Sequence, residues 1–309
     1  MAAELVLGSV QLGLSYGAAN RTGKPSRGLA LRLVRRAVNA GVSSIDTARA
    51  YGESEERLGE ALWGRNPVRT ITKLSPLSEL AENASRADTQ AAVDASIAES
   101  LAALKRERID CLLLHRASHM TSHDGAIWER LVELLAHGTV LSLGVSVQTP
   151  QEASTALGCA DVRHIQLPFN LLDWRWRESG VIARMEARSQ VTVHARSVFL
   201  QGLLANEPDL WPQIDGVDAC ALARLLDELA KQYGREGAAD LCVAYARGQS
   251  WIDGVVVGME TEDQLHENLR LFLRPPLSAQ DCAAIERRIP RVPETLLNPA
   301  CWPKRADHA

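Results

Sequence analysis

The stretch SSIDTARAYGESEERLGEALWGRNPVRTITK, residues 43–73, decides the fold. It begins with a short apolar run at Ser43–Asp46 and ends with another at Thr70–Lys73. Between them, Glu55–Trp63 places two leucines four residues apart, which is the spacing of one helix face. Short apolar runs of this length suit buried strands. The stretch therefore predicts one strand–helix–strand unit.

The same alternation continues along the chain, with about 35 residues from one strand to the next, the size of a βα unit. The eight expected strands are Leu5–Gly8, Ser43–Asp46, Thr70–Lys73, Cys111–His115, Leu141–Val145, His164–Gln166, Val191–Ala195 and Gly254–Val257. The expected helices are Gly28–Ala40, Glu55–Trp63, Thr89–Lys105, Ile127–Ala136, Pro150–Leu157, Gly180–Arg188, Ala219–Tyr233, Glu236–Gln249 and Thr261–Leu273. Eight such units predict an α/β fold, a (β/α)8 TIM barrel.

A doubly wound open sheet is the competing architecture, and it would show a G-x-G-x-x-G turn after the first strand. The glycines that follow that strand, at positions 8, 13 and 17, do not have this spacing. No Gly/Ser-rich linker divides the chain. We expect a single domain over residues 1–309, with a barrel at about 4–273 and a C-terminal extension, 274–309, that adds a helix and a Pro-rich tail.

Composition narrows the class of protein. The chain has 309 residues, 46% of them hydrophobic, and its 34 Lys and Arg against 38 Asp and Glu give a net charge of −4. This balance disfavours a protein built to bind nucleic acid or an anionic membrane. No run approaches a membrane span, the start lacks a signal-peptide pattern, and the six cysteines are scattered. These features predict a cytoplasmic protein.

Ionisable residues follow three successive strands. Asp46, Lys73 and His115 stand at the strand ends, and Tyr51 follows five residues after Asp46. An ammonium beside a phenol lowers its pKa from about 10, and an imidazole can polarise a carbonyl oxygen. Each group alone could be a structural ion-pair member. Together they favour reduction of an aldehyde or ketone, with the hydride supplied by a cofactor.

These residues resemble the aldo-keto reductase family over roughly residues 4–273. The matching segments are DTARAYG (46–52) with the following E-x-x-L-G pattern, TKL (72–74), LLLH (112–115), GVS (144–146), IQLPFNLLD (165–173), RSVFLQGLL (196–204) and VVVGMETEDQLHENL (255–269). The resemblance implies a catalytic tetrad of Asp46, Tyr51, Lys73 and His115, with Tyr51 as general acid in reduction and base in oxidation. It also implies a nicotinamide dinucleotide across the barrel mouth and no metal. The implied cofactor-binding residues are Ser9, Gln11, Asp46, Ser146, Gln166, Arg196, Ser197, Phe199, Gln201, Gly202, Gly258, Met259, Glu260, Gln264, Glu267 and Asn268.

Four departures from the family pattern concern the cofactor and the barrel floor. Val147 replaces an asparagine that often follows G-x-S, and Arg196 replaces an aromatic residue. The family default is NADP(H), but residues 259–263 carry three acids and no base, which favours NAD(H). Arg270 is the nearest downstream base. The first expected strand begins at Leu5, so the N-terminal hairpin of many family members is not expected in this sequence.

Three residues are candidates for the substrate pocket. Tyr16, Arg116 and Trp174 belong to loops at the expected active face. Arg116 could contact an anionic or polyhydroxylated substrate, or pair with Asp124. Trp174 could instead pack at a helix start. His115, His119 and His123 have zinc-like spacing, but they are expected on a strand end and a loop rather than on one helix face.

The favoured function is an NAD(P)-dependent oxidoreductase that interconverts an aldehyde, ketone or aldose with the alcohol or lactone by direct hydride transfer. Two alternatives remain open. One is an NAD(P)-binding regulatory subunit, and the other is a non-redox sugar isomerase or lyase on the same barrel. The expected partner is a small carbonyl or sugar substrate, and the chain is expected to be a monomer or a small homo-oligomer.

Overall fold

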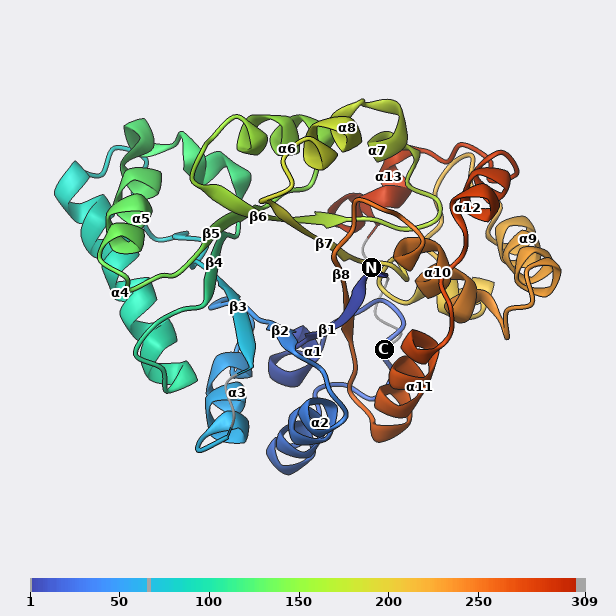
Figure 1. Cartoon of the computed structure of the whole chain (residues 1–309), viewed down its shortest axis with the longest axis horizontal. Helices are drawn as coiled ribbons and strands as arrows, with labels where there is room; N and C mark the ends of the chain where they lie inside the picture. The colour runs from blue at the N-terminus through green and yellow to red at the C-terminus, as the bar shows by residue number, and fades with distance from the viewer. Residues whose placement is uncertain (1, 66–67, 304–309) are drawn as a thin grey trace.

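The computed structural model describes residues 2–65 and 68–303, and in them eight parallel strands close into a barrel (Figure 1). β1 pairs with β8 along all five of its residues, from Glu4 opposite Gly254 to Gly8 opposite Gly258. The predicted (β/α)8 barrel is confirmed, and the open sheet is excluded. The strands are β1 (Glu4–Gly8), β2 (Ser44–Asp46), β3 (Arg69–Lys73), β4 (Cys111–Leu114), β5 (Leu143–Ser146), β6 (Val162–Pro168), β7 (Thr192–Arg196) and β8 (Gly254–Gly258).

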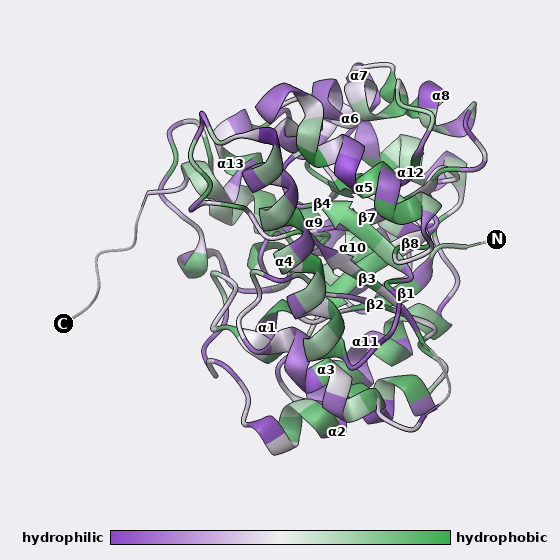
Figure 2. Ribbon diagram, turned by 90° about the vertical axis from the view of Figure 1, so that its left-hand side faces the viewer, coloured by the Kyte–Doolittle hydropathy of each residue, from purple (hydrophilic) through white to green (hydrophobic). Residues whose placement is uncertain are grey.

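The longer helices between the strands, together with α11, form a ring outside the barrel (Figure 1). They are α2 (Arg27–Asn39), α3 (Ser54–Leu62), α4 (Arg86–Leu104), α5 (Ala126–Ala136), α6 (Pro150–Leu157), α8 (Val181–Glu186), α9 (Ala219–Gln232), α10 (Ala238–Arg247) and α11 (Glu262–Leu273). Figure 2 shows mostly hydrophobic strands inside, and helices whose colour alternates between hydrophobic and hydrophilic residues. None of the helices in residues 2–65 and 68–303 is both long and apolar enough to cross a membrane.

Helix α6 shows how local sequence fixes a loop near the barrel mouth. Thr149 caps the helix by accepting from the backbone N–H of Glu152, whose carboxylate in turn accepts from the backbone N–H of Thr149. Pro150 occupies the first helical position, where its missing N–H costs nothing. The helix therefore begins at the predicted residue, and the short segment between β5 and α6 is held in one conformation.

Two histidines fill the barrel interior below the mouth. His164 on β6 and His194 on β7 are buried, and their rings meet edge to face with centroids 4.3 Å apart. A Cβ on Gly254 would lie 2.9 Å from the imidazole of His194, so the glycine makes room for this ring. Both ring nitrogens of His164, and Nδ1 of His194, have no hydrogen-bond partner among the described residues. Burial of this kind disfavours the charged imidazole.

These histidines predict that the fold loses stability in acid. Burial is the largest cause that lowers the pKa of His164, and it lowers the pKa of His194 from 6.5 to about 3. Below pH 6.5 these histidines become protonated in the unfolded chain but stay neutral in the folded chain. The free energy of unfolding is therefore fully present above that pH and falls as the pH drops towards 3. Each histidine contributes a slope of up to about 1.4 kcal/mol per pH unit.

Urea unfolding between pH 7.5 and 5 measures this slope. His194→Leu is expected to flatten the slope by up to about 1.4 kcal/mol per pH unit, since one titrating group is lost. His137→Leu, at an exposed position after α5, is the matched control and is expected to keep the wild-type slope. Equal slopes for His194→Leu and the wild type would contradict this account of the interior.

The C-terminal extension adds helices α12 (Ala279–Glu286) and α13 (Glu294–Leu297) and the 3-10 turn η5 (Pro299–Cys301). The predicted additional helix is thus confirmed as α12. Figure 2 places α13 at the same end of the barrel as α1 (Val10–Gly13), the end where the strands finish. Residues 304–309 of the predicted tail lie outside the described residues. The predicted division into one domain with an extension from residue 274 stays a prediction.

Candidate active site

Three ionisable side chains lie at the carboxyl ends of neighbouring strands, where a TIM barrel carries its catalytic groups. Asp46 is the last residue of β2, Lys73 is the last residue of β3, and His115 follows β4 directly. Tyr51 belongs to the loop from β2 to α3. The four residues of the predicted tetrad therefore lie at one mouth.

An ion pair holds the ammonium of Lys73 beside the phenol ring. Nζ donates to the two carboxylate oxygens of Asp46 at 2.7 and 2.8 Å and to the carbonyl oxygen of Thr47 at 2.9 Å. It lies 4.9 Å from the centroid of the Tyr51 ring. The His115 ring packs edge-on against Tyr51, with centroids 5.9 Å apart. Phenol, ammonium and imidazole are therefore contiguous.

The loop that carries Tyr51 is fixed against α1, a helix of four residues that was too short to predict from periodicity. The backbone N–H of Tyr51 donates to Ala48, and its carbonyl oxygen accepts from the N–H of Ser54 at 3.1 Å. A Cβ on Gly13 would lie 1.8 Å from that same carbonyl oxygen. Only glycine allows so close an approach of the two backbones.

Lys73 stays protonated despite its burial. Desolvation is the largest influence on its pKa and favours the neutral amine. The charges of Asp46 and Tyr51, with their hydrogen bonds, act the other way, and the net result is a raised pKa for Lys73. Because one partner alone would be an uncompensated buried charge, Lys73 and Asp46 depend on each other.

His115 is neutral at physiological pH. Its pKa is lowered from 6.5 to about 3, first by burial and then by the positive charges of Lys73, Arg196 and Arg116. Its Nδ1 is buried and has no hydrogen-bond partner among the described residues. A neutral imidazole donates one hydrogen bond without carrying a charge. The residue is therefore suited to polarise an oxygen atom rather than to protonate it.

A cavity of about 360 Å³ opens beside Tyr51. Tyr16, a predicted substrate residue, lines it as well. Most of the predicted cofactor residues also line this cavity. They come from the ends of β2, β7 and β8 and from the segments that follow β1, β7 and β8, including α1 and α11. These are Ser9, Gln11, Asp46, Arg196, Ser197, Phe199, Gln201, Gly202, Gly258, Glu260, Gln264, Glu267 and Asn268.

Three predicted cofactor residues lie outside the cavity lining. Ser146 is the buried last residue of β5, and Gln166 on β6 donates through Nε2 to Asp46 at 2.6 Å. The Oε1 atom of Gln166 is buried and unpartnered among the described residues, so it remains available to a ligand. Met259 packs in the hydrophobic core with no exposed surface. Its side chain therefore faces the core rather than the cavity.

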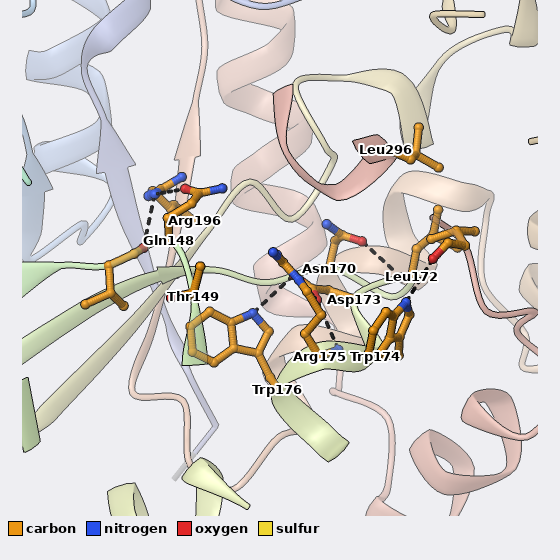
Figure 3. A network of polar contacts seen from close by, with 12 residues as sticks. Gln148, Thr149, Asn170, Leu172, Asp173, Trp174, Arg175, Trp176, Arg196 and Leu296 are labelled. Atoms are coloured by element: carbon orange, nitrogen blue, oxygen red, sulfur yellow. Dashed lines mark hydrogen bonds and ion pairs between the residues drawn. The ribbon is translucent and has the colours of Figure 1, made fainter. Parts of the chain in front are cut away.

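Trp174 is held by the C-terminal segment and does not line the cavity. Its indole N–H donates to the carbonyl oxygen of Val292 at 2.9 Å, and the guanidinium of Arg291 lies 3.5 Å from the centroid of its ring. Nearby, Asp173 accepts from Arg175 and from the indole of Trp176 (Figure 3). The structure therefore supports the packing alternative for Trp174 over the predicted pocket wall.

Arg196, at the end of β7, is fixed across to the segment between β5 and α6. Its Nη2 donates to Gln148 Oε1 at 2.9 Å and to the carbonyl oxygen of Val147 at 3.3 Å (Figure 3). Gln148 did not stand out in the sequence, because a single glutamine in a turn carries no pattern. The contact holds a half-buried guanidinium at the edge of the cavity.

In the acidic segment after β8, Glu260 is hydrogen-bonded by Gln264 at both its backbone and its carboxylate. Gln264 accepts from the backbone N–H of Glu260 at 2.8 Å and donates to its carboxylate at 3.1 Å. Glu260 is buried, and it lines the cavity. Arg270, the base expected to be closest to this acidic segment, forms an ion pair with Glu236 instead. The end of the cavity near α11 therefore presents carboxylate and amide groups.

The remaining candidates do not form a metal site. His119 lies in the 3-10 turn η1 (Ala117–Met120) and His123 in η2 (His123–Gly125), so neither shares a helix with His115. Among the described residues, no group of three or more His, Cys, Asp or Glu side chains could hold a metal ion.

Two asparagines of the cavity wall, Asn20 and Asn206, carried no signal in the sequence because they fall in irregular loops.

Comparison with known proteins agrees with this geometry. The aldo/keto reductase family model matches residues 4–289. The aldo-keto reductase YhdN of Bacillus subtilis (strain 168) is 27% identical over 153 residues, which span 48% of this chain and only 46% of that relative. The holo form of aldo-keto reductase AKR11C1 from Bacillus halodurans has 22% identity, with a TM-score of 0.76 over 94% of this chain and 93% of that one. Its apo form has 21% identity and a TM-score of 0.70 over 91% and 92%. The chain belongs to the aldo/keto reductase family, a family of oxidoreductases.

Proposed function

We propose that the protein interconverts a carbonyl compound and its alcohol by hydride exchange with a nicotinamide dinucleotide. The observation that carries this proposal is the contact of Lys73 and His115 with Tyr51 beside a cavity of about 360 Å³. A proton donor and a neutral hydrogen-bond donor then face one point at which a carbonyl oxygen can sit.

The cavity residues fit a dinucleotide. Oε1 of Gln166 and Oε1 of Gln11 are buried acceptors without a partner among the described residues, as an amide-bearing ligand requires. The loop after β7 holds Ser197, Leu200 and Gln201 at positive φ, a costly backbone form that persists where function needs it. Ser146 and Gln166 would hold the carboxamide, and the loop from Ser197 to Gly202 would lie along the pyrophosphate.

The chain's own residues then divide the proton chemistry. When bound, the dinucleotide supplies or takes the hydride, which no side chain can do. Tyr51 donates its phenol proton to the carbonyl oxygen in reduction and removes it from the alcohol in oxidation. Lys73 keeps its charge and stabilises the phenolate that remains, while Asp46 fixes the ammonium in place. His115 donates a hydrogen bond to the same oxygen as a neutral group.

The acidic end of the cavity predicts a preference for NADH over NADPH. The buried carboxylate of Glu260 can accept from a free ribose hydroxyl and would repel a 2′-phosphate. We expect NADH to bind at least about tenfold more tightly, which corresponds to ~1.4 kcal/mol. Tryptophan fluorescence titrated in parallel with the two nucleotides measures this ratio.

A matched pair of variants isolates the cause of that preference. Glu260→Gln is expected to bring the affinities for NADH and NADPH closer together, because it removes the negative charge of the side chain and keeps its shape. Asp263→Asn makes the same charge change at an exposed position outside the cavity lining, and is expected to leave the ratio as it is. Tighter binding of NADPH by the wild type would contradict the preference. Failure of both nucleotides to bind would contradict the proposed function itself and favour a non-redox barrel enzyme.

A further inference from the structure

Two arginines stand at strand ends of the barrel mouth near His115. Arg196 ends β7 and lines the same cavity as Tyr51, whereas Arg116 follows His115 directly in the chain and lies outside the cavity lining. Four positively charged or basic groups lower the pKa of this imidazole through space, namely Lys73, Arg196, Arg116 and His119. Of these, only Lys73 has its charge compensated, by the carboxylate of Asp46 at 2.7 Å. His119 is itself held towards its neutral form, by burial first and then by the charge of Arg116. Two guanidinium charges, on Arg116 and Arg196, are left over at the mouth.

Neither arginine is neutralised by the described part of the chain. Within residues 2–65 and 68–303, no carboxylate forms an ion pair with Arg116 or Arg196. The pair between Arg116 and Asp124 that the sequence suggested as an alternative does not form. Arg130 illustrates the contrast, since its guanidinium pairs with the carboxylate of Asp94 at 2.8 Å. Arg116 and Arg196 therefore leave two positive charges without a paired carboxylate in the described part of the chain.

Both side chains also keep hydrogen-bond donors free. Arg196 donates to the protein only through Nη2, to Gln148 and Val147. Its Nε and Nη1 have no acceptor among the described residues. Arg116 makes no side-chain hydrogen bond to them at all, and its side chain is exposed after the end of β4. The free guanidinium of Arg116 can therefore bind a carboxylate or phosphate in a bidentate way. Arg196 has lost the shared Nη2, so its Nε and Nη1 can each donate a single hydrogen bond.

We propose that the carbonyl substrate carries an anionic group, a carboxylate or a phosphate, which Arg116 and Arg196 bind while its carbonyl oxygen lies at His115 and Tyr51. This inference rests on the proposed function and specifies its substrate class. The binding is electrostatic and leaves the hydride and proton chemistry unchanged. Arg196 is fixed by Gln148 and supplies a rigid contact, whereas the exposed Arg116 closes on the anion from the solvent side.

Matched substrate pairs test the charge alone. 4-Carboxybenzaldehyde is compared with its neutral methyl ester, and glyceraldehyde 3-phosphate is compared with glyceraldehyde, each at low and high salt. The quantity measured is the ratio of kcat/KM for the anionic over the neutral member, which divides out changes in folding or turnover. We expect at least one ratio to exceed about ten at low salt and to fall as salt screens the contact. The pair with the larger ratio identifies carboxylate or phosphate.

Variants then assign the ratio to the two arginines. Arg116→Met is expected to lower the ratio of kcat/KM for the anionic over the neutral substrate about fivefold, mainly through KM. Arg116→Lys is expected to retain most of this ratio. Arg196→Met is expected to lower it further, because its guanidinium is half-buried. Arg108→Met removes the same charge from an exposed position just before β4, at the opposite end of the barrel, and is expected to leave the ratio unchanged.

The outcomes separate this proposal from the proposed function. If no aldehyde is turned over with NADH or NADPH, the proposed function fails. If aldehydes are reduced but neither anionic member is preferred, the anion proposal alone is overturned. A ratio that Arg116→Met and Arg108→Met change equally would also overturn it. If Arg196→Met weakens NADH binding and leaves the ratio intact, the part assigned to Arg196 is wrong and that residue belongs to the dinucleotide site.

Discussion

Tyr51→Phe is expected to lower the turnover of any aldehyde substrate by about 10²–10⁴-fold, the usual contribution of a positioned general acid. The variant loses one oxygen atom, and with it the proton donor of the ring that contacts both Lys73 and His115. The phenyl ring keeps the packing against both neighbours, so the fold and the binding of the dinucleotide are expected to persist. Aldehyde-dependent oxidation of NADH, followed by absorbance, measures the loss.

A second tyrosine provides the matched control. Tyr233→Phe removes the same atom at the end of α9, on the outer ring of helices, and is expected to keep wild-type turnover. Retention of more than about a tenth of wild-type activity by Tyr51→Phe would mean that another group supplies the proton.

Lys73→Met is expected to destabilise the protein by about 3–5 kcal/mol and to remove activity. The loss of stability has a specific cause, because the variant leaves the Asp46 carboxylate buried without its cation. The double variant Lys73→Met/Asp46→Asn removes both charges. Its asparagine can still accept from Gln166 Nε2, which now donates to Asp46 at 2.6 Å. We therefore expect the double variant to recover most of the stability and none of the turnover.

Urea unfolding at pH 7.5 and aldehyde turnover together distinguish a structural pair from a catalytic one. If the Lys73–Asp46 pair were only structural, the double variant would regain activity along with stability. If the pair contributed nothing to the folded state, Lys73→Met would unfold at the wild-type urea concentration. Either result would contradict the account of this site.

The sequence predicted the strands best where apolar runs end in an ionisable residue. Asp46 and Lys73 mark the ends of β2 and β3 directly, since a charge on a buried strand is tolerated only at the mouth. Leu141 was expected to begin the fifth strand, but it is 48% exposed and lies before β5. An isolated bridge between Ile109 and Val140 precedes the β4–β5 ladder, which starts at Leu143, and the apolar run does not reveal this interruption.

The site residues were predictable where a sequence motif fixes their backbone position. They were less predictable where tertiary packing decides which way a side chain points. Residues 197–202 and 258–268 carry the predicted cavity residues because the motif and the loop coincide. Met259 lies within the same motif but faces the core, since neighbouring residues after a strand point in opposite directions. The contact between Trp174 and Val292 joins segments 118 residues apart, and no local pattern encodes it.

The most direct test of the central claim follows the hydrogen itself. The purified protein is given an unlabelled aldehyde and NADH that carries deuterium at both C4 positions, and the alcohol is analysed by mass spectrometry. The account predicts one deuterium on the former carbonyl carbon of the wild-type product, with its formation strongly reduced in Tyr51→Phe. An alcohol without deuterium, or equal amounts of labelled alcohol from both proteins, would contradict it.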